Sequence, residues 1–321
     1  MSKTKPGEGK FQIKDIFALL KETFKEWNKD DPWRLSAVVA YYALLSLPAL
    51  LVIIVNVAGA IYGQDAVTGE LSEQIGDAIG PEAATSVESM IREASKSDKS
   101  TISTIIGIAT LLFGATGVFF HLQKSLNYIW EVRQDPKYPL KRMLFDRARG
   151  FGFVLVVGFL LLISLILTST LSVLSSWIKE NLPEFLLSIF FIINFITSVG
   201  TISLLFALIF KFLPDVEIKW GTVWVGAVVT ALLFVLGKFL LGIYFGHSDP
   251  GSTYGAAGSL ILILLWVSYS CLIVFFGAEF TQVYARYYGH KIMPSAHSIK
   301  VRVIEEMEGH QEVSGEKDRS D

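Results

Sequence analysis

The stretch PGSTYGAAGSLILILLWVSYSCLIVFFGA at residues 250–278 contains no charged side chain. A helix of about 20 apolar residues spans the hydrocarbon core of a bilayer, so this stretch is long enough to cross a membrane. Five further charge-free runs divide the 321-residue chain: Ser36–Gln64, Thr101–Gln123, Gly150–Ile178, Phe185–Phe210 and Trp220–Gly237. The last run reaches spanning length only if it continues through Lys238 to about Phe245. The pattern predicts an all-α integral membrane protein with six transmembrane helices.

The composition supports this fold class and excludes several others. Residues of the AVILMFWYC set make up 52% of the chain and charged residues only 18%, a balance too apolar for disorder or a nucleic-acid-binding tail. A single cysteine, Cys271, rules out an intrachain disulfide framework. We therefore expect membrane lipids, and no nucleic acid, as the surroundings of this chain.

The predicted membrane domain covers residues 33–288, between a cytoplasmic segment at 1–32 and a polar tail at 289–321 that we expect to be flexible. Its six helices are predicted at about 34–62, 102–122, 150–177, 185–211, 220–245 and 255–281. Lys and Arg number 23 in the N-terminal segment and alternate loops but four in the intervening segments. The positive-inside rule then places both termini in the cytoplasm, and a bacterial inner (plasma) membrane fits best.

Two segments outside the predicted spans have amphipathic helical patterns. Phe11–Trp27 carries lysines on one side and an apolar stripe on the other, which is typical of a helix in the headgroup layer. The stripe consists of Ile16, Phe17, Leu20, Phe24 and Trp27. Residues 65–99, between the first two spans, repeat apolar positions on both sides of Gly80-Pro81. They are expected to form an exoplasmic helical cap, a surface where an envelope protein could bind.

Four ordered motifs resemble the YihY/BrkB family of bacterial inner-membrane proteins. They are AYYALLSLPALL at 40–51, HLQKSLNYIWEV at 121–132, KFLPDVEIKW at 211–220 and STYGAAGSLILILLWVSYSCLIVFFGAEF at 252–280. The resemblance implies a six-helix fold with cytoplasmic termini and carries an older family label, ribonuclease BN. Structural roles are expected for the motif residues Tyr41, Gln123, Asn127, Trp130, Pro214, Trp266 and Gly277.

The nuclease label finds little support in the residues. Metal-dependent hydrolysis needs clustered His, Asp and Glu ligands, but the five histidines form no H-x-H or H-x-x-E-H pattern. The sequence contains neither a P-loop nor a G-x-S-x-G motif. We therefore expect a protein without catalytic residues, metal or cofactor, and rank ribonuclease activity below the other functions.

Polar side chains at membrane depth are the candidate functional residues, because burying them in lipid is costly. The candidates for a cavity or coupling site are Lys238, Glu279, Asn56, His121, Tyr42 and Ser46. Each has a structural alternative: Lys238 can snorkel to the headgroups, Asn56 can pack helices, and His121 can bond a carbonyl. Glu279, two turns from Arg286 on the same face, can be an interhelix partner. Candidate hinges are Pro48, Gly255 and Gly258.

Two functions follow from these residues. The first is a transporter or flippase-like protein that moves an anionic amphipathic or lipid-like substrate, or an ion, through a polar cavity. The alternative is a non-catalytic membrane scaffold or envelope assembly factor, in which the polar residues only pack helices and the cap binds a partner. A homo-oligomer is compatible with both. Convergence of the candidate residues on one solvated cavity would favour transport, and a dry, tightly packed bundle in which these groups satisfy one another would favour the scaffold.

Overall fold

The computed structural model describes residues 15–95, 117–135, 184–248, 254, 257–290, 292–295 and 298–301. The elements are α1 (Asp15–Lys29), α2 (Pro32–Tyr62), α3 (Gln64–Ile79), α4 (Pro81–Ser95), the helical segment 117–129, β1 (Val132–Gln134), α7 (Glu184–Phe212), β2 (Val216–Glu217), α8 (Trp220–Ser248), α9 (Gly258–Tyr287), β3 (Met293–Pro294) and β4 (Ser298–Lys300). The predicted span at 150–177, most of that at 102–122, and Gly255 lie outside the described residues.

The described helices include three that are long and apolar enough to cross a membrane. They are Phe195–Phe212 in α7, Trp220–Phe245 in α8 and Gly258–Tyr287, which is the whole of α9. The structure is mostly helical, as expected for an all-α membrane protein. The total of six spans and the orientation of the chain stay predictions.

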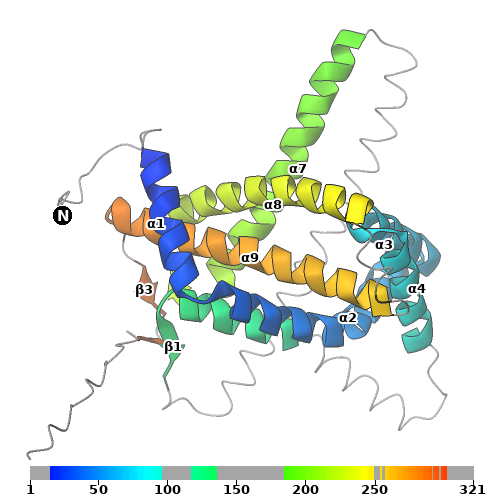
Figure 1. The fold of residues 1–321 in the computed structure, drawn as a ribbon, viewed down its shortest axis with the longest axis horizontal. Helices are drawn as coiled ribbons and strands as arrows, with labels where there is room; N and C mark the ends of the chain where they lie inside the picture. Colours follow the sequence, from blue (N-terminus) through cyan, green and yellow to red (C-terminus); the bar gives the residue numbers. More distant parts are fainter. Residues whose placement is uncertain are drawn as a thin grey trace, which may run out of the picture.

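Helices α2, α9 and α8 lie side by side along the long axis of the molecule, with α9 between the other two (Figure 1). Helix α7 packs against α8 and rises steeply away from this layer. The hairpin of α3 and α4 sits at one end of the layer, whereas α1 and the short strands sit at the other. The structure thus has two distinct ends, which we call the hairpin end and the strand end.

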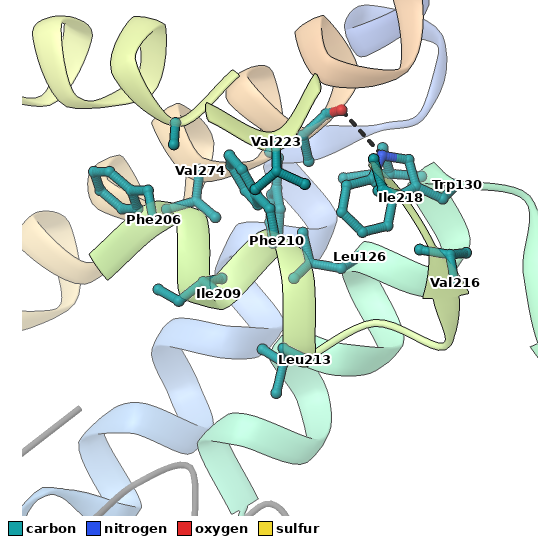
Figure 2. Close-up of a cluster of buried hydrophobic side chains, with 14 of the residues drawn as sticks. Leu126, Trp130, Phe206, Ile209, Phe210, Leu213, Val216, Ile218, Val223 and Val274 are labelled. Carbon is teal, nitrogen blue, oxygen red and sulfur yellow. Dashed lines mark hydrogen bonds between the residues drawn. The ribbon is translucent and has the colours of Figure 1, made fainter. Parts of the chain in front are cut away.

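The strand end holds the larger hydrophobic cluster, drawn in Figure 2. Phe210 of α7 is fully buried, and its ring lies 6.1 Å from that of Trp130 in an edge-to-face arrangement. The Trp130 indole N–H donates a hydrogen bond to the carbonyl oxygen of Ala278 in α9, at 3.0 Å. Trp130 therefore ties the end of segment 117–129 to α9 while its ring fills the core.

Helices α3 and α4 form the hairpin end, within the segment where the sequence predicts a helical cap. Gly63 and Gly80 have positive φ angles of 89° and 100°, which glycine adopts without steric cost, and they separate α2, α3 and α4. The Ser72 hydroxyl donates to the Glu88 carboxylate at 2.6 Å, linking the two helices. Val87 of α4 is buried in a second hydrophobic cluster that includes residues of α2. The exoplasmic position of this hairpin stays a prediction.

The chain after Gly289 differs from the flexible tail that the sequence suggested. Strand β3 pairs antiparallel with β2, and β4 pairs antiparallel with β1. These pairs satisfy backbone groups of the chain that follows segment 117–129 and α7. The expectation of a flexible tail is therefore corrected for residues 292–295 and 298–301.

Helix α1 packs on α9 through only part of the predicted apolar stripe, since Leu20 and Trp27 contact the bundle. Leu19 and Thr23 are buried against α9, where Leu19 clusters with Phe280. Phe17 and Phe24 of the stripe are 78% and 58% exposed. The helix is thus held by a narrow inner face and presents aromatic rings outward. A place for these rings in the headgroup layer stays a prediction.

Reciprocal contacts between glycine and threonine set the distance between α8 and α9. A Cβ atom on Gly226 would overlap Thr281, and a Cβ atom on Gly277 would overlap Thr230. Each threonine hydroxyl also donates, at 2.7 Å, to the glycine carbonyl four residues earlier in its own helix. We call these four residues the Gly-Thr interlock. Small residues of this kind let helix backbones approach closely where water exclusion contributes little.

Gly226→Ala should lower the thermal midpoint of unfolding in detergent, because the added methyl group forces α8 and α9 apart. Overpacking of a tight contact costs about 1–3 kcal/mol. Gly242→Ala is the matched control on the same helix, since a Cβ atom there has no neighbour within 4 Å. Equal midpoints for the two variants would show that the interlock does not fix the helix distance.

Candidate functional site

Glu279 is the most deeply buried charged residue among those the structure describes, with a side chain 2% exposed. One carboxylate oxygen, Oε1, lies 3.8 Å from Nη2 of Arg286, whose side chain is 56% exposed. The other oxygen, Oε2, is buried and has no hydrogen-bond partner. The carboxylate is thus held by one long ion pair, with half of its acceptor capacity unused.

Helix α1 lies across α9 at this place. The Trp27 ring packs edge-on against Phe276 with centroids 5.9 Å apart, one turn before Glu279. At the other end of α1, the Asp15 carboxylate accepts hydrogen bonds from the hydroxyls of Tyr287 and Tyr288 at 3.4 and 3.3 Å. The α1–α9 interface therefore covers Glu279 and shields it from bulk solvent.

The charges around Glu279 are mostly negative. Asp30, Glu26 and Glu131 all interact electrostatically with it, and Arg286 is the opposing positive charge. Partial burial, followed by repulsion from Glu26, raises the pKa of Asp30 to about 6. Asp30 therefore exchanges a proton near neutral pH at the edge of the α1–α9 interface.

Tyr42, Ser46 and His121 form a second group of candidate residues that the structure brings together. The rings of Tyr42 and His121 stack with centroids 3.6 Å apart and planes inclined by 13°. Gly117 sits beside both α2 side chains, since its Cβ would lie 3.4 Å from the Ser46 hydroxyl and 3.8 Å from the Tyr42 ring. Tyr41 packs edge-on against Tyr42 and is itself exposed. This group joins segment 117–129 to α2.

Lys238 and Asn56 lie away from Glu279. Lys238 is exposed on α8, next to Gly237, which contacts Tyr269 of α9. Tyr269 is ten residues from Glu279, or about 15 Å along the helix. Asn56 is exposed and accepts a hydrogen bond from the Gln64 side chain at 3.1 Å. These contacts place the candidate residues at separate points of the bundle rather than around one cavity.

The distance between Asn56 and Glu279 can be followed along α9. Val55, next to Asn56 in α2, clusters with Ile263, near the start of α9. Glu279 is sixteen residues further along, about 24 Å at the helical rise.

The candidate hinges have simple structural settings. Helix α2 continues through Pro48, whose missing N–H leaves the carbonyl of Leu44 without its usual helical donor. Gly258 is buried at the first residue of α9.

Two of the family-motif residues, Gln123 and Asn127, bond to Asp215. The Asn127 side-chain amide donates to Asp215 Oδ2 at 2.8 Å, and its Oδ1 accepts the Asp215 backbone N–H at 2.8 Å. Gln123 donates to Asp215 Oδ1 at 3.3 Å. Pro214 beside it is buried. Elsewhere, Trp266 packs edge-on against Phe234 and Gly277 belongs to the Gly-Thr interlock.

Sequence reasoning missed Asp215 itself. Its carbonyl oxygen also accepts the Ser295 backbone N–H at 2.9 Å and the Ser298 hydroxyl at 2.7 Å. Asp215 thus connects segment 117–129, the α7–α8 loop and the chain after α9. The signal was the Leu-Pro-Asp sequence at 213–215, a turn that ends α7 with an acceptor side chain. We call this set of hydrogen bonds the Asp215 clamp.

Within the part of the chain that the structure describes, no group of three or more His, Cys, Asp or Glu residues could hold a metal ion. His121 and His290 are in separate environments, the latter bonded through Nδ1 to the Thr222 hydroxyl at 2.8 Å. The sites that the structure offers are therefore the buried carboxylate under α1 and the Tyr42–His121 stack.

Comparison with known proteins gives a consistent family match. The family model described as "Virulence factor BrkB" matches residues 23–300. A UPF0761 membrane protein of Alteromonas mediterranea is 27% identical over 84% of this chain and 87% of its own length. One from Haemophilus influenzae is 25% identical over 80% of this chain and 91% of its length. The match to a Tolumonas auensis relative, 28% identical over 60% of this chain, spans 59% of that protein. No solved structure matches.

Asn127→Ala should destabilise the protein, because it removes the two 2.8 Å hydrogen bonds that the Asn127 side chain makes with Asp215. A hydrogen bond to a charged group contributes about 1.5–3 kcal/mol. Thermal unfolding of the detergent-solubilised chain measures this loss, with Asn28→Ala on the exposed side of α1 as the control. If both variants unfold at the wild-type temperature, the Asp215 clamp does not hold the strand end together.

Asp30→Asn should stabilise the protein above pH 6 and leave it unchanged near pH 4. The pKa of Asp30 is raised in the folded state from 3.8 to about 6, so the folded state binds the proton more tightly. Stability from this group is therefore lost as the pH rises between these values, and asparagine removes that loss. Thermal midpoints measured across this pH range should show that Asp30→Asn gains stability over the wild type as the pH rises. The variant Glu73→Gln, at an exposed carboxylate, should show no such gain. A difference in midpoint between Asp30→Asn and the wild type that is the same at every pH would contradict the raised pKa of Asp30.

Proposed function

The chain belongs to the virulence factor BrkB family of membrane proteins, and we propose that it is a transporter or flippase-like protein for an anionic amphipathic or lipid-like substrate, or for an ion. The observation that carries this proposal is the buried, half-satisfied carboxylate of Glu279 in the long apolar helix α9. We propose further that the protein lies in the inner membrane with six spans and both termini in the cytoplasm, and that it is not an enzyme.

A purely structural role explains Glu279 poorly. Burying a carboxylate is costly unless short, well-oriented bonds satisfy all of its acceptor positions. The Glu279–Arg286 pair is long, its arginine is mostly exposed, and Oε2 has no partner. A carboxylate in this setting is stabilised when it binds a proton or a new positive partner. Binding of this kind is what couples a carboxylate to transport.

Lys238 supports the choice of an anionic, lipid-like substrate. It is exposed on α8 among large apolar side chains that are also exposed, including Leu236 and Phe239. A face of this composition suits contact with lipid chains, and a lysine within it can bring its ammonium group to a phosphate. The excess of Lys and Arg in the predicted cytoplasmic segments would attract the same headgroups.

A second function, the non-catalytic scaffold, is favoured by one observation. Glu279, Lys238 and Asn56 occupy separate places in the bundle, so they do not line one common path. A scaffold needs only a stable bundle and an accessible binding surface, which the hairpin of α3 and α4 would supply. The transport assay below separates the two functions.

Glu279→Gln should slow transport by on the order of tenfold while leaving the amount of folded protein unchanged, because glutamine keeps the shape but removes the charge. The assay uses full-length protein in vesicles of phosphatidylethanolamine and phosphatidylglycerol that contain fluorescent phosphatidylglycerol. Dithionite, which cannot cross the membrane, bleaches the outer leaflet, and further bleaching reports movement of the lipid between leaflets.

Glu217→Gln, an exposed carboxylate in β2, is the matched control and should transport at the wild-type rate. Bleaching by wild-type vesicles that equals that of protein-free vesicles would refute movement of phosphatidylglycerol. If the same vesicles also show no flux of protons or cations, the scaffold is left as the function.

A further inference from the structure

The interface between α1 and α9 contains three buried polar atoms without hydrogen-bond partners. They are Thr23 Oγ1 and Trp27 Nε1 on α1 and Glu279 Oε2 on α9. Thr23 is completely buried and Glu279 is 2% exposed. Buried polar atoms in native proteins almost always have a partner, and a group of orphaned atoms commonly marks the position of a bound ion or water.

The packing of the two helices brings these three residues to the same part of the interface. Asp15 bonds Tyr287 and Tyr288 near the end of α9, whereas Trp27 contacts Phe276 three turns earlier. The two helices therefore run in opposite senses along their contact, although α1 crosses α9 steeply (Figure 1). Leu19, one turn before Thr23 on the same face of α1, clusters with Phe280, the residue after Glu279. Thr23 thus lies on the side of α1 that faces α9, near the level of Glu279, with Trp27 one turn further along.

The charges nearby favour a cation at this level. Lys29 approaches Glu26 to 3.6 Å, and Lys300 approaches Glu131 to 3.9 Å, so two carboxylates already have basic partners. Arg286 is near one oxygen of Glu279. Asp30 adds a further carboxylate at the edge of the interface. A positive charge beside Glu279 Oε2 would balance the remaining negative charge.

We propose that Thr23 and Glu279 form a binding site for a small monovalent metal cation, such as Na⁺ or K⁺, between α1 and α9. This inference rests on the proposed function, because it assigns the coupling ion to the same carboxylate. Oε2 of Glu279 and Oγ1 of Thr23 coordinate the cation, and water molecules complete its coordination shell. One such water can accept the hydrogen bond that Trp27 Nε1 is able to donate.

The donor set suits a monovalent cation better than a divalent one. Carboxylate and hydroxyl oxygens are hard ligands of the kind that hard metal ions prefer. A divalent ion such as Ca²⁺ takes six to eight oxygen ligands, usually including several carboxylates. Here one carboxylate oxygen is available, and within the described residues no metal cluster of acidic groups is present.

The test is a thermal unfolding measurement on the purified full-length protein in detergent. NaCl, KCl and N-methyl-D-glucamine chloride are compared at equal concentration and constant pH. Na⁺ or K⁺ should raise the midpoint by about 2–4 °C over the bulky organic cation, which cannot enter the site. Thr23→Val and Glu279→Gln should each abolish this difference, and Thr85→Val, on the exposed side of α4, should keep it.

Equal midpoints of the wild type in all three salts would overturn the proposal, whatever the stability of the variants. So would a cation effect that persists in both Thr23→Val and Glu279→Gln, because the ion would then bind elsewhere. If low pH raises the midpoint and the three salts give equal values, a proton rather than a metal ion occupies the site. This result would also refute the proposal. Slow transport by Glu279→Gln without any salt-specific shift would refute this site but keep the proposed function.

Discussion

The close approach of α8 and α9 is the constraint on which the rest of the structure depends. The Gly-Thr interlock leaves no room for a Cβ atom at Gly226 or Gly277, so the two backbones are held at one distance and in one register. Glu279 lies between Gly277 and Thr281 in sequence but on another face of α9, toward α1. Since the interlock fixes the rotation of α9, it also fixes the direction in which the buried carboxylate points.

The strand end is held by polar contacts between segments that are distant in sequence. The Asp215 clamp joins segment 117–129 to the α7–α8 loop, and the chain after α9 adds its strands to both. The Trp130 indole connects this assembly to the carbonyl of Ala278, the residue immediately before Glu279. The candidate site is therefore bounded by the clamp on one side and by α1 on the other. The clamp makes many mutual hydrogen bonds, whereas α1 is attached mainly by one apolar face.

The sequence predicts the long helices well because their signal is local. Charge-free runs mark α2, α7, α8 and α9, and Gly80-Pro81 marks the break in the hairpin. Strands β1 to β4 have two or three residues each and pair over long sequence distances, so no local period reveals them. Glu279 stands out as a charge at the end of an apolar run, and the structure pairs it with Arg286 as its helical spacing suggested. Thr23 does not stand out, because its importance comes only from what α9 places opposite it.

Helix α1 is attached to the bundle next to the buried carboxylate of Glu279. Its inner face gains apolar contact from Leu19 but leaves Thr23 and Trp27 without partners, so part of the benefit of docking is lost. A cation that engages Thr23 and Glu279 together binds only the docked state, and it would shift the population toward that state by its binding free energy. The outward rings of Phe17 and Phe24 would stay near the headgroups in either state. Occupation of a site in the bundle would thereby change the position of a helix at its edge, which is the kind of motion that alternating access requires.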